Sequence, residues 1–354
     1  METKEFMGKD SIGPFRQLVN GARKAAVLAH THPDGDALGS GCAMTLWLQD
    51  VCGKQAAFLL PDSPPDNLRF IIPSSCRLFC QDANPGQAEA WLQESDLVIL
   101  LDCNGFSRTE GLAPLAQASP APKVLIDHHL NPERESFNLV FSTPDISSAS
   151  ELLYWILREL GWPALTDGVI PGPGREPDPI GYALLAGMTT DTNNFANSVY
   201  PSTFRMASEL IAAGVNREQL LLQLYNSYRE NRIRLFGYME SEVLRIIGKG
   251  AYMVITRSIQ ERFDILEGET EGLVNVPMAI GKVKLSVLLK EDEGHFRVSI
   301  RSKKGTSAQQ MAVRFFHGGG HENAAGGKLY IGQDIASPEE ASAYVESAIR
   351  TFLP

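Results

Sequence analysis

Short apolar runs that alternate with helix-like segments are the feature that most restricts the fold of this chain. Four of these runs have the length and composition of buried strands, at residues 25–29, 55–60, 97–101 and 123–126. Helix-like segments lie between or after them, at residues 39–48, 86–93 and 150–160. Because strands that alternate with helices form parallel sheets covered on both faces, we predict an α/β fold with a doubly wound, mainly parallel sheet.

The pattern changes in the second half of the chain. Residues 202–243 are helical in character, and strand-like runs follow at residues 251–256, 283–289 and 296–301, with a last helix at residues 339–352. The 354 residues are enough for two cores. We therefore predict a first domain over residues 1–225, a helical linker over 226–243 and a smaller α+β domain over 244–354. The Gly- and Pro-rich residues 166–179 are expected to form a surface loop.

Composition restricts the partners and the compartment. The formal net charge of -10 disfavours a track for duplex DNA, which needs a broad basic surface, but permits a small anion held at a local site. The five cysteines form no CxxC pair, so a disulfide framework or a zinc ribbon is not expected. Neither a signal peptide nor a membrane span is expected, and the cytoplasm is the simplest compartment.

Carboxylates and imidazoles follow three of the four predicted strands. Because the carboxyl ends of parallel strands meet at one edge of a sheet, we expect these side chains to gather there. A further aspartate follows the apolar segment 180–188. The complete set is His30, Asp34, Asp36, Asp102, Asp127, His128, His129 and Asp191.

Each of these clusters, taken alone, has an ordinary structural explanation. Asp34-Gly35-Asp36 is also a turn sequence, in which Asp36 would cap the next helix. Asp102 could be a turn residue, and a pair of histidines is more often structural than metal-binding. Their combination at one sheet edge favours divalent ions, manganese or magnesium before zinc. Two ions about 3.5–4 Å apart are the usual device for hydrolysing phosphoesters.

The complete pattern resembles the DHH phosphoesterase superfamily over residues 25–195. It consists of HxxxDxDxxGS, an aspartate at a strand end, the Asp-His-His run and a fourth aspartate. The resemblance implies two divalent ions, with manganese expected and magnesium the alternative. One ion would be held by His30, Asp34 and Asp102, and the other by Asp36, Asp102, His128 and Asp191. Asp102 would bridge the ions, Asp127 would orient His128, and His129 would face the substrate phosphate, so Asp102, Asp127 and His129 are the expected catalytic residues.

Arg108 follows the bridging aspartate by six residues, in the sequence DCNGFSR. A guanidinium group binds phosphate through two parallel hydrogen bonds, so Arg108 could clamp the substrate. A surface arginine explains the residue equally well, and the sequence leaves both interpretations open.

A glycine-rich turn marks the second domain. The sequence GGGHENAAG, with Arg301 on the preceding strand, predicts from the residues alone a turn that an anion can approach, or a tight hairpin. Together with the first domain it resembles the DHH-associated domain of type 1. The resemblance implies that this domain binds the nucleotide end of the substrate, with the active site in the cleft between the domains. The implied substrate-binding residues are Arg301, His317, Gly319, Gly320 and His321.

The pairing of these two domains resembles the stand-alone nano-RNase and oligoribonuclease (NrnA-like) branch of the superfamily. That resemblance implies a nuclease acting on short RNA or on linear dinucleotides such as pApA, a phosphatase acting on 3′-phosphoadenosine 5′-phosphate (pAp), or both. Alternatives are a cyclic-dinucleotide phosphodiesterase, an inorganic pyrophosphatase or exopolyphosphatase, and a nucleotide-binding module without catalysis. No membrane partner is expected, and a homodimer remains open.

Overall fold

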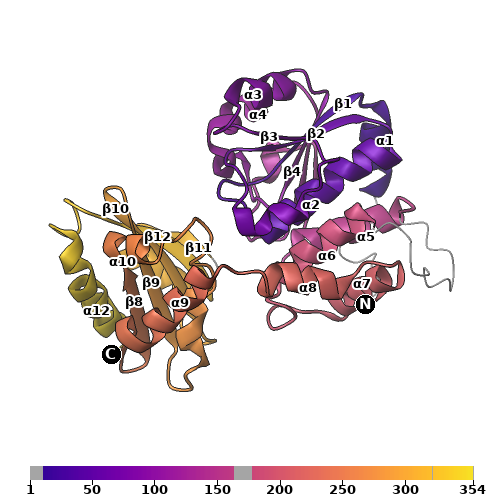
Figure 1. The fold of residues 1–354 in the computed structure, drawn as a ribbon. Coiled ribbons are helices and arrows are strands. Elements are labelled where there is room, and N and C mark those ends of the chain that lie inside the picture. The colour runs from indigo at the N-terminus through magenta and orange to yellow at the C-terminus, as the bar shows by residue number, and fades with distance from the viewer. Residues whose placement is uncertain (1–10, 163–177, 321, 354) are drawn as a thin grey trace. The chain divides into compact units, whose positions relative to one another are not determined.

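The computed structural model of the chain describes residues 11–162, 178–320 and 322–353. It divides into two compact units, Met1–Ser227 and Tyr228–Pro354, and each is described by itself below (Figure 1). Most of the loop expected at residues 166–179 lies outside the described residues. His321 also lies outside them.

The sheet of the first unit is entirely parallel. Its strands have the order β3-β2-β1-β4-β5-β6, and every neighbouring pair runs in the same direction. This confirms the predicted parallel sheet. The two outer strands, three and four residues long, were not predicted. The six strands are β1 (Lys24–Leu28), β2 (Gln55–Leu60), β3 (Leu78–Cys80), β4 (Leu97–Leu101), β5 (Lys123–Asp127) and β6 (Leu139–Ser142).

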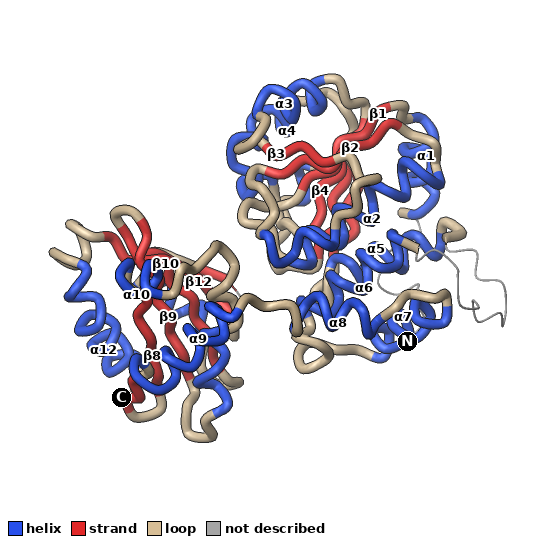
Figure 2. The backbone as a smooth tube through the Cα atoms, in the orientation of Figure 1, coloured by secondary structure: helices blue, strands red, loops and turns tan. Residues whose placement is uncertain are grey.

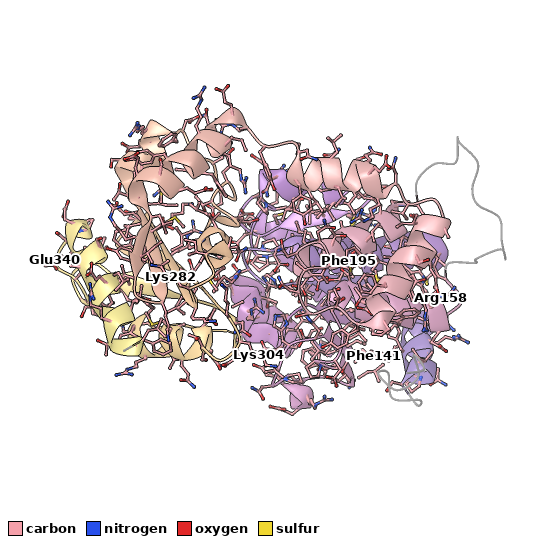
Figure 3. The ribbon with its side chains drawn as sticks, turned by 90° about the horizontal axis from the view of Figure 1, so that it is seen from below. Phe141, Arg158, Phe195, Lys282, Lys304 and Glu340 are labelled. Carbon is pink, nitrogen blue, oxygen red and sulfur yellow. The ribbon has the colours of Figure 1, made fainter. Side chains whose placement is uncertain are left out.

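Helices cover both faces of this sheet (Figure 2). Along β1, Val27 contributes to one core and Leu28 to the other, as the alternation of side chains in a strand requires. Phe141 of β6, labelled in Figure 3, belongs to the first core. Its ring packs edge-on against Phe15 at 5.6 Å between ring centroids. The helical elements of the first core are α1 (Ile12–Gly21), α2 (Gly35–Leu46), a π-helical turn (Trp47–Val51), α5 (Ala149–Glu159), α6 (Pro179–Asp191), α7 (Pro201–Ala212) and α8 (Arg217–Tyr225). Those of the second core are α3 (Pro85–Gln93), a 3₁₀ segment (Phe106–Leu112) and α4 (Ala113–Ala118).

The strand order reverses between β1 and β4. From β1 the chain moves outward through β2 and β3, and then returns to β4 on the other side of β1. At such a reversal the loops that leave the carboxyl ends of the two strands diverge, which is where open α/β sheets bind ligands. His30 follows β1 and Asp102 follows β4, so both lie at this point.

Helix α2 begins four residues before the predicted start because Asp34, rather than Asp36, is its cap. Asp34 Oδ1 accepts hydrogen bonds from the backbone N–H groups of Asp36 at 3.0 Å and Ala37 at 3.1 Å. The interpretation in which Asp36 caps the helix is therefore wrong. Asp36 lies in the first turn with its side chain directed into the protein, 1% exposed.

Close packing of α2 against α6 depends on two glycines. A Cβ atom at Gly39 would lie 2.5 Å from the backbone oxygen of Ala183 on α6. A Cβ atom at Gly187 would overlap the hydroxyl of Ser150 and lie 2.9 Å from Asp36 Oδ1. Since no real side chain tolerates such distances, these glycines set how closely Asp36 and the end of α6 approach each other.

The second unit contains a mixed sheet in the order β11-β12-β10-β9-β8-β7. Only β8 and β9 pair in parallel, and the other neighbours are antiparallel. One face is covered by α11 (Ala308–Phe315) and α12 (Ala341–Phe352). The other is covered by α9 (Glu230–Tyr238), a π-helical turn (Met239–Val243), α10 (Arg257–Arg262) and a 3₁₀ segment (Leu273–Ala279). The strands are β7 (Arg245–Ile247), β8 (Gly250–Ile255), β9 (Leu285–Asp292), β10 (His295–Ser302), β11 (Gly319–Gly320) and β12 (Ala324–Tyr330).

Most of the segment expected to be a linker belongs to the second unit. Leu235 of α9 and Met239 of the following turn are fully buried, in a core that contains Met253 and Leu273. These apolar side chains give α9 a face that must be covered, and the second sheet covers it. The boundary between the units falls after Ser227, two residues beyond the predicted end of the first domain at residue 225.

The five cysteines all lie in the first unit. All five cysteines are free thiols, and four of them are buried. Burial raises the pKa of Cys52 and of Cys80 to about 11, which keeps these thiols protonated. Across the described residues, no helix combines the length and the apolar character that a membrane crossing requires.

Candidate metal centre

Residues from the carboxyl ends of β1 and β4 form the first group of possible metal ligands. His30 Nε2 lies 3.6 Å from Asp102 Oδ2 and 3.9 Å from Asp34 Oδ2. One ligand atom from each of these three residues lies within 4.8 Å of the other two. His30 and Asp102 are buried, whereas the Asp34 side chain is 60% exposed, so the group opens to solvent on the Asp34 side.

The second group surrounds His128, which follows β5. His128 Nε2 lies 3.4 Å from Asp102 Oδ1, 3.8 Å from Asp191 Oδ2 and 3.9 Å from Asp36 Oδ2. Asp36 comes from the first turn of α2, and Asp191 is the last residue of α6. The tight α2–α6 packing thus brings together two aspartates that are 155 positions apart in the sequence.

Asp102 lies between the two groups and turns one carboxylate oxygen toward each. Oδ2 faces His30, and Oδ1 faces His128 and, at 3.6 Å, His129. The residue is 2% exposed, and among the described residues Oδ1 has no hydrogen-bond partner. Its backbone adopts a left-handed conformation with φ of 53°, which an L residue populates only where the surroundings enforce it.

The spacing of these atoms fits a bound cation. Ligand atoms about 2.0–2.2 Å from one ion are roughly 3.0–3.5 Å apart, close to the distances of 3.4 to 3.9 Å found here. The same distances are too long for direct hydrogen bonds. His30 Nδ1 donates to the backbone oxygen of Thr31 at 2.8 Å, which leaves Nε2 to face Asp34 and Asp102 as a ligand. The residues present therefore fit divalent ions.

Electrostatics of the site favour the same conclusion. Burial and the neighbouring Asp102 carboxylate raise the pKa of Asp36 to about 7. Burial and the Asp36 carboxylate likewise raise the pKa of Asp191. Burial opposes the charged form of His128, but Asp102, Asp191 and Asp36 outweigh it and raise the pKa of that imidazole to about 10. A divalent cation would stabilise the ionised carboxylates, which otherwise repel one another in a buried site.

Asp36 is anchored by the start of α5, a contact that the sequence analysis missed. Its Oδ2 accepts from Ala149 N at 2.6 Å and its Oδ1 from Ser150 N at 2.9 Å. These donors lie in the first turn of α5, where backbone N–H groups lack partners within the helix. The sequence did carry a signal for this helix start, since Ser148 and Glu151 have the spacing of a capping box.

Asp127 pairs with His129 rather than with His128. Asp127 Oδ1 accepts a hydrogen bond from His129 Nδ1 at 2.7 Å, and the aspartate is completely buried. The sequence analysis expected Asp127 to orient His128. In the structure the second histidine of the run receives that support, and the imidazole of His128 is surrounded by Asp36, Asp102 and Asp191.

Arg108 lies beside the first group. Its backbone oxygen accepts from Thr31 N at 2.8 Å. Burial opposes the charged form of His30, but the Asp102 and Asp34 carboxylates outweigh it and raise the pKa of that imidazole, and the positive charge of Arg108 partly offsets this rise. The side chain is half-buried and forms no ion pair within the described part of the chain. A cation so placed suits an anion, and the sequence analysis had left this interpretation open.

Asp62 supports the loop that carries His30 and was also missed. It follows β2, and its Oδ2 accepts hydrogen bonds from the Thr31 hydroxyl and from His32 N, the latter at 2.7 Å. The signal was available, because Asp62 stands just beyond a predicted strand, as Asp102 and Asp127 do.

The expected substrate residues of the second unit have mixed surroundings. Arg301 is half-buried on β10, and its Nη1 donates to the backbone oxygen of Ile300 at 3.0 Å. Burial lowers the pKa of Arg301, and no described carboxylate pairs with it. His317 instead pairs with Asp334 at 2.9 Å. Gly319 and Gly320 form a short edge strand against β12, which matches the hairpin interpretation.

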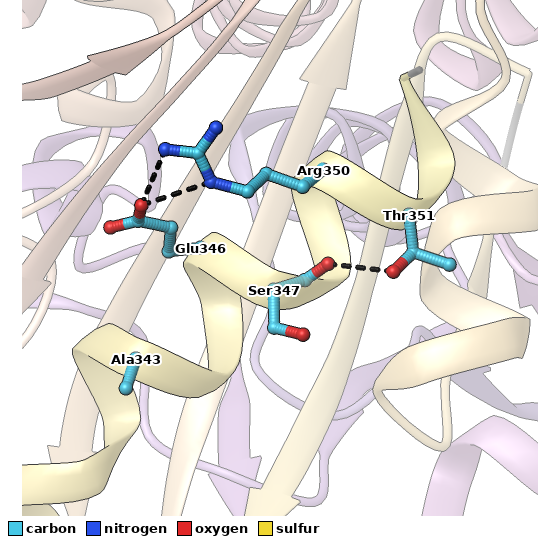
Figure 4. Close-up of a pocket in the computed structure, with 5 residues that line it drawn as sticks. All are labelled: Ala343, Glu346, Ser347, Arg350 and Thr351. Carbon is cyan, nitrogen blue, oxygen red and sulfur yellow. Dashed lines mark hydrogen bonds and ion pairs between the residues drawn. The ribbon is translucent and has the colours of Figure 1, made fainter.

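A hollow on the second unit lies along the outer face of α12 (Figure 4). Its only cation, Arg350, is already paired with Glu346 at 2.7 Å, and Thr351 donates to the backbone oxygen of Ser347. None of the predicted site residues lines it. The hollow is lined by Ala343, Glu346, Ser347, Arg350 and Thr351.

An open parallel sheet with carboxylates and imidazoles at its point of reversal defines an α/β protein with a candidate two-ion centre. Residues 24–172 match the DHH family, N-terminal domain, and residues 249–350 match the DHHA1 domain. The crystal structure of an exopolyphosphatase-related protein from Bacteroides fragilis is 31% identical, with a TM-score of 0.87, over 98% of this chain and 97% of that one. The chain belongs to the DHH family, and the resemblance found in the sequence is confirmed.

Two curated relatives are similar along most of their length. A bifunctional oligoribonuclease and PAP phosphatase NrnA from Bacillus subtilis is 27% identical over 85% of this chain and 88% of the relative. The protein of the same description from Thermus thermophilus is 29% identical over 86% of this chain and 83% of the relative.

Proposed function

We propose that the chain is a phosphoesterase that uses two divalent ions, expected to be manganese, to hydrolyse short oligoribonucleotides, linear dinucleotides such as pApA, or pAp. The observation that carries this proposal is Asp102, a buried carboxylate with one oxygen toward each of two ligand groups. A carboxylate in this position would be a ligand shared by two ions, which is the arrangement used in two-ion hydrolysis of phosphoesters.

The ligands divide between the ions as the two groups do. His30, Asp34 and Asp102 would hold one ion, and Asp36, Asp102, His128 and Asp191 the other. When bound, such ions generate a nucleophile from water at neutral pH and stabilise negative charge on the phosphoryl oxygens. Magnesium is the alternative to manganese, because both accept carboxylate oxygens.

Two further residues of the first unit, His129 and Arg108, would act on the substrate. His129, oriented by Asp127, would hold or donate a proton at the phosphate, since its Nδ1 is engaged by Asp127 Oδ1. Arg108 would bind a phosphate oxygen, because its guanidinium lies near His30 without an ion-pair partner among the described residues. Neither residue is needed to hold an ion in this scheme.

Similar proteins support the substrate class. The relatives from Bacillus subtilis and Thermus thermophilus are described as acting on oligoribonucleotides and PAP. The net charge of -10 suits a substrate short enough for a local site. Arg301, His317, Gly319, Gly320 and His321 of the DHHA1 domain are proposed to bind the nucleotide part of the substrate, with Arg301 as the cation.

Two alternatives also have named relatives. The similar crystal structure is of an exopolyphosphatase-related protein, which favours polyphosphate or pyrophosphate as a substrate. A cyclic-di-AMP phosphodiesterase from Geobacillus thermodenitrificans is 25% identical over 88% of this chain, but this chain covers only 45% of it. All three activities would use the same ligand groups, so only a comparison of substrates separates them.

A substrate panel with manganese tests the proposal. The purified chain is incubated with pAp, pApA, RNAs of two to five nucleotides, cyclic di-AMP, pyrophosphate and polyphosphate. The proposal predicts release of nucleoside monophosphate or phosphate from the first three substrates. Cleavage of pyrophosphate or polyphosphate alone would support the exopolyphosphatase alternative, and cleavage of cyclic di-AMP alone the phosphodiesterase. No cleavage of any substrate, with manganese bound, would contradict the proposal.

A further inference from the structure

Two neighbouring residues at the start of α7, Thr203 and Phe204, connect to Asp36 and Asp191. We infer that the first turn of α7 positions both of these carboxylates, and so sets the affinity of the second ion separately from that of the first. Thr203 and Phe204 are then positioning residues that touch neither substrate nor ion. The inference rests on the proposed function, because it assigns them a role toward the ions proposed there.

The connection to Asp36 runs through the start of α5. Asp36 accepts hydrogen bonds from the backbone N–H groups of Ala149 and Ser150. The position of this turn is fixed by Ser148, whose Oγ accepts from Glu151 N at 2.9 Å, and by the Glu151 side chain. Displacement of this turn would remove two hydrogen-bond donors from Asp36. Because the Glu151 side chain helps to fix the turn, the position of the Asp36 carboxylate depends on the contacts of Glu151.

Glu151 is a fully buried carboxylate whose described hydrogen-bond donors are all neutral. Oε1 accepts from Trp155 Nε1 at 3.2 Å. Oε2 accepts from the Ser147 hydroxyl, from Ser147 N at 3.2 Å and from the Thr203 hydroxyl at 2.7 Å. A buried carboxylate depends on each of its donors, because water cannot replace a lost one without rearrangement.

The hydroxyl of Thr203 has a defined orientation. While it donates to Glu151, it accepts a hydrogen bond from Tyr200 N at 3.0 Å, at the N-terminal end of α7. The Thr203 hydroxyl thus forms hydrogen bonds with both the N-terminal end of α7 and the buried Glu151 carboxylate of α5. These two bonds fix the position of α7 relative to α5. The start of α7 therefore determines where Asp36 finds its donors.

The connection to Asp191 runs through the segment that follows it. Asn193, Asn194 and Phe195 are consecutive residues with φ of 47°, 55° and 67°. Asparagine tolerates this left-handed backbone, whereas a bulky side chain such as Phe195 adopts it only where its surroundings hold it. Thr192 contributes to this, because its backbone oxygen accepts from Ala196 N and Asn197 N at 2.9 Å and its hydroxyl accepts from Phe195 N at 3.1 Å.

Two side chains contact the ring of Phe195. Its ring stacks on Phe204 with centroids 5.2 Å apart and an angle of 18°, and the Arg217 guanidinium lies 5.7 Å from its centroid. Arg217 also donates to Asn194 Oδ1 at 2.7 Å. Loss of the Phe204 ring would allow the segment to relax, and Asp191, two residues before Asn193, would move with it.

The first ligand group is held by other elements. His30 donates to Thr31 O, Asp34 caps α2, and Asp102 N donates to the backbone oxygen of Ile126 on β5. None of these described contacts involves α7. The two ions should therefore respond differently to changes in that helix.

Manganese titration of two variants tests this inference. Thr203→Val removes the hydroxyl at nearly constant volume, and Phe204→Ala removes the ring from a side chain that is 54% exposed. In calorimetry and electron paramagnetic resonance, each variant should bind one ion with wild-type affinity and the second about 10- to 100-fold more weakly. Thr203→Ser, which restores the hydroxyl, should recover the second ion.

Tyr154→Phe is a matched control. It removes the hydrogen bond between the Tyr154 hydroxyl and Glu209, which also joins α5 to α7 but lies farther from Asp36 along α5. Both ions should bind it as in the wild type, even if its unfolding temperature falls. Equal weakening of both ions in the α7 variants, or wild-type affinity for the second ion in folded Thr203→Val and Phe204→Ala, would overturn the inference. A wild-type protein that binds fewer than two ions would instead overturn the proposed function.

Discussion

Asp127 and His129 form a hydrogen-bonded pair, with 2.7 Å between Oδ1 and Nδ1, at the carboxyl end of β5. The preceding imidazole, His128, lies within 3.9 Å of carboxylate oxygens from Asp36, Asp102 and Asp191. The two adjacent histidines therefore have different surroundings, and we propose that His128 is a metal ligand and that His129 handles a proton.

Substitution of the two histidines should separate catalysis from metal binding. We expect His129→Gln to lower kcat by about 10²- to 10⁴-fold while two manganese ions remain bound, because a proton donor is lost but no proposed ligand. His128→Gln should lose the second ion. Metal analysis beside steady-state kinetics distinguishes them. Loss of an ion from His129→Gln would show that this residue is a ligand.

A methyl group at position 187 should disturb the second ligand group. In Gly187→Ala the new Cβ would overlap the Ser150 hydroxyl and press on Asp36, at a cost of roughly 1–3 kcal/mol in the free energy of unfolding. The affinity for the second ion should fall with it. Gly237→Ala, in a helix position with nothing within 4 Å, is the control and should stabilise by about 0.5–1 kcal/mol. Unchanged stability and metal affinity in Gly187→Ala would contradict the described packing.

Manganese affinity should rise with pH. A group whose pKa is raised holds its proton at a pH where the isolated group has lost it, and the ion must then displace that proton. Asp36, with a pKa of about 7, and His128, with a pKa of about 10, both hold protons at pH 6. Between pH 6 and 7 we expect affinity to increase by at least about tenfold, with proton release measured by calorimetry in two buffers. Affinity that is constant over this range would refute the expectation.

Arg301 should contribute to substrate binding but not to metal binding. Arg301→Met keeps the apolar stem and removes a half-buried cation that lacks a described carboxylate partner. We expect KM to rise about tenfold or more with unchanged metal content, as for a lost charge-assisted hydrogen bond. Arg297→Met, on the same strand, removes a cation already paired with Glu267 and Asp292, and its KM should stay near the wild-type value. Equal effects on KM in both variants would refute the specific role.

The candidate metal centre could be located from the sequence because residues that follow parallel strands gather at one edge of the sheet, whatever the other details of the fold. Buried apolar runs marked β1, β4 and β5, and parallel strands place the residues that follow them at one edge. The short outer strands β3 and β6, of three and four residues, lacked a pattern long enough to identify. Helix α9 lies in the segment predicted as a linker, because a helix with one apolar face does not reveal in its sequence which unit covers that face.

The hydrogen-bond partners within the candidate metal centre could not be predicted, because they depend on side-chain directions that the spacing of residues in the sequence does not give. Asp34 and Asp36 are both acceptable caps, and only the path of the chain after His30 decides that Asp34 caps α2. In the same way, His128 and His129 are both within reach of Asp127, and the side-chain directions at the end of β5 select His129. The hydrogen bonds from Ala149 N and Ser150 N to Asp36 join segments more than 110 positions apart, and no local sequence pattern predicts such a contact.

Manganese titration of Asp102→Ala tests the central claim most directly. Asp102 is the residue shared by both ligand groups, so its removal should weaken both ions together and abolish hydrolysis of pApA and pAp. Asp66→Ala removes an exposed carboxylate elsewhere in the first unit and should leave both ions bound. We predict that the wild type and Asp66→Ala bind two ions, and that Asp102→Ala binds neither ion at wild-type affinity. One ion retained at full affinity in a folded Asp102→Ala protein would contradict the bridging role.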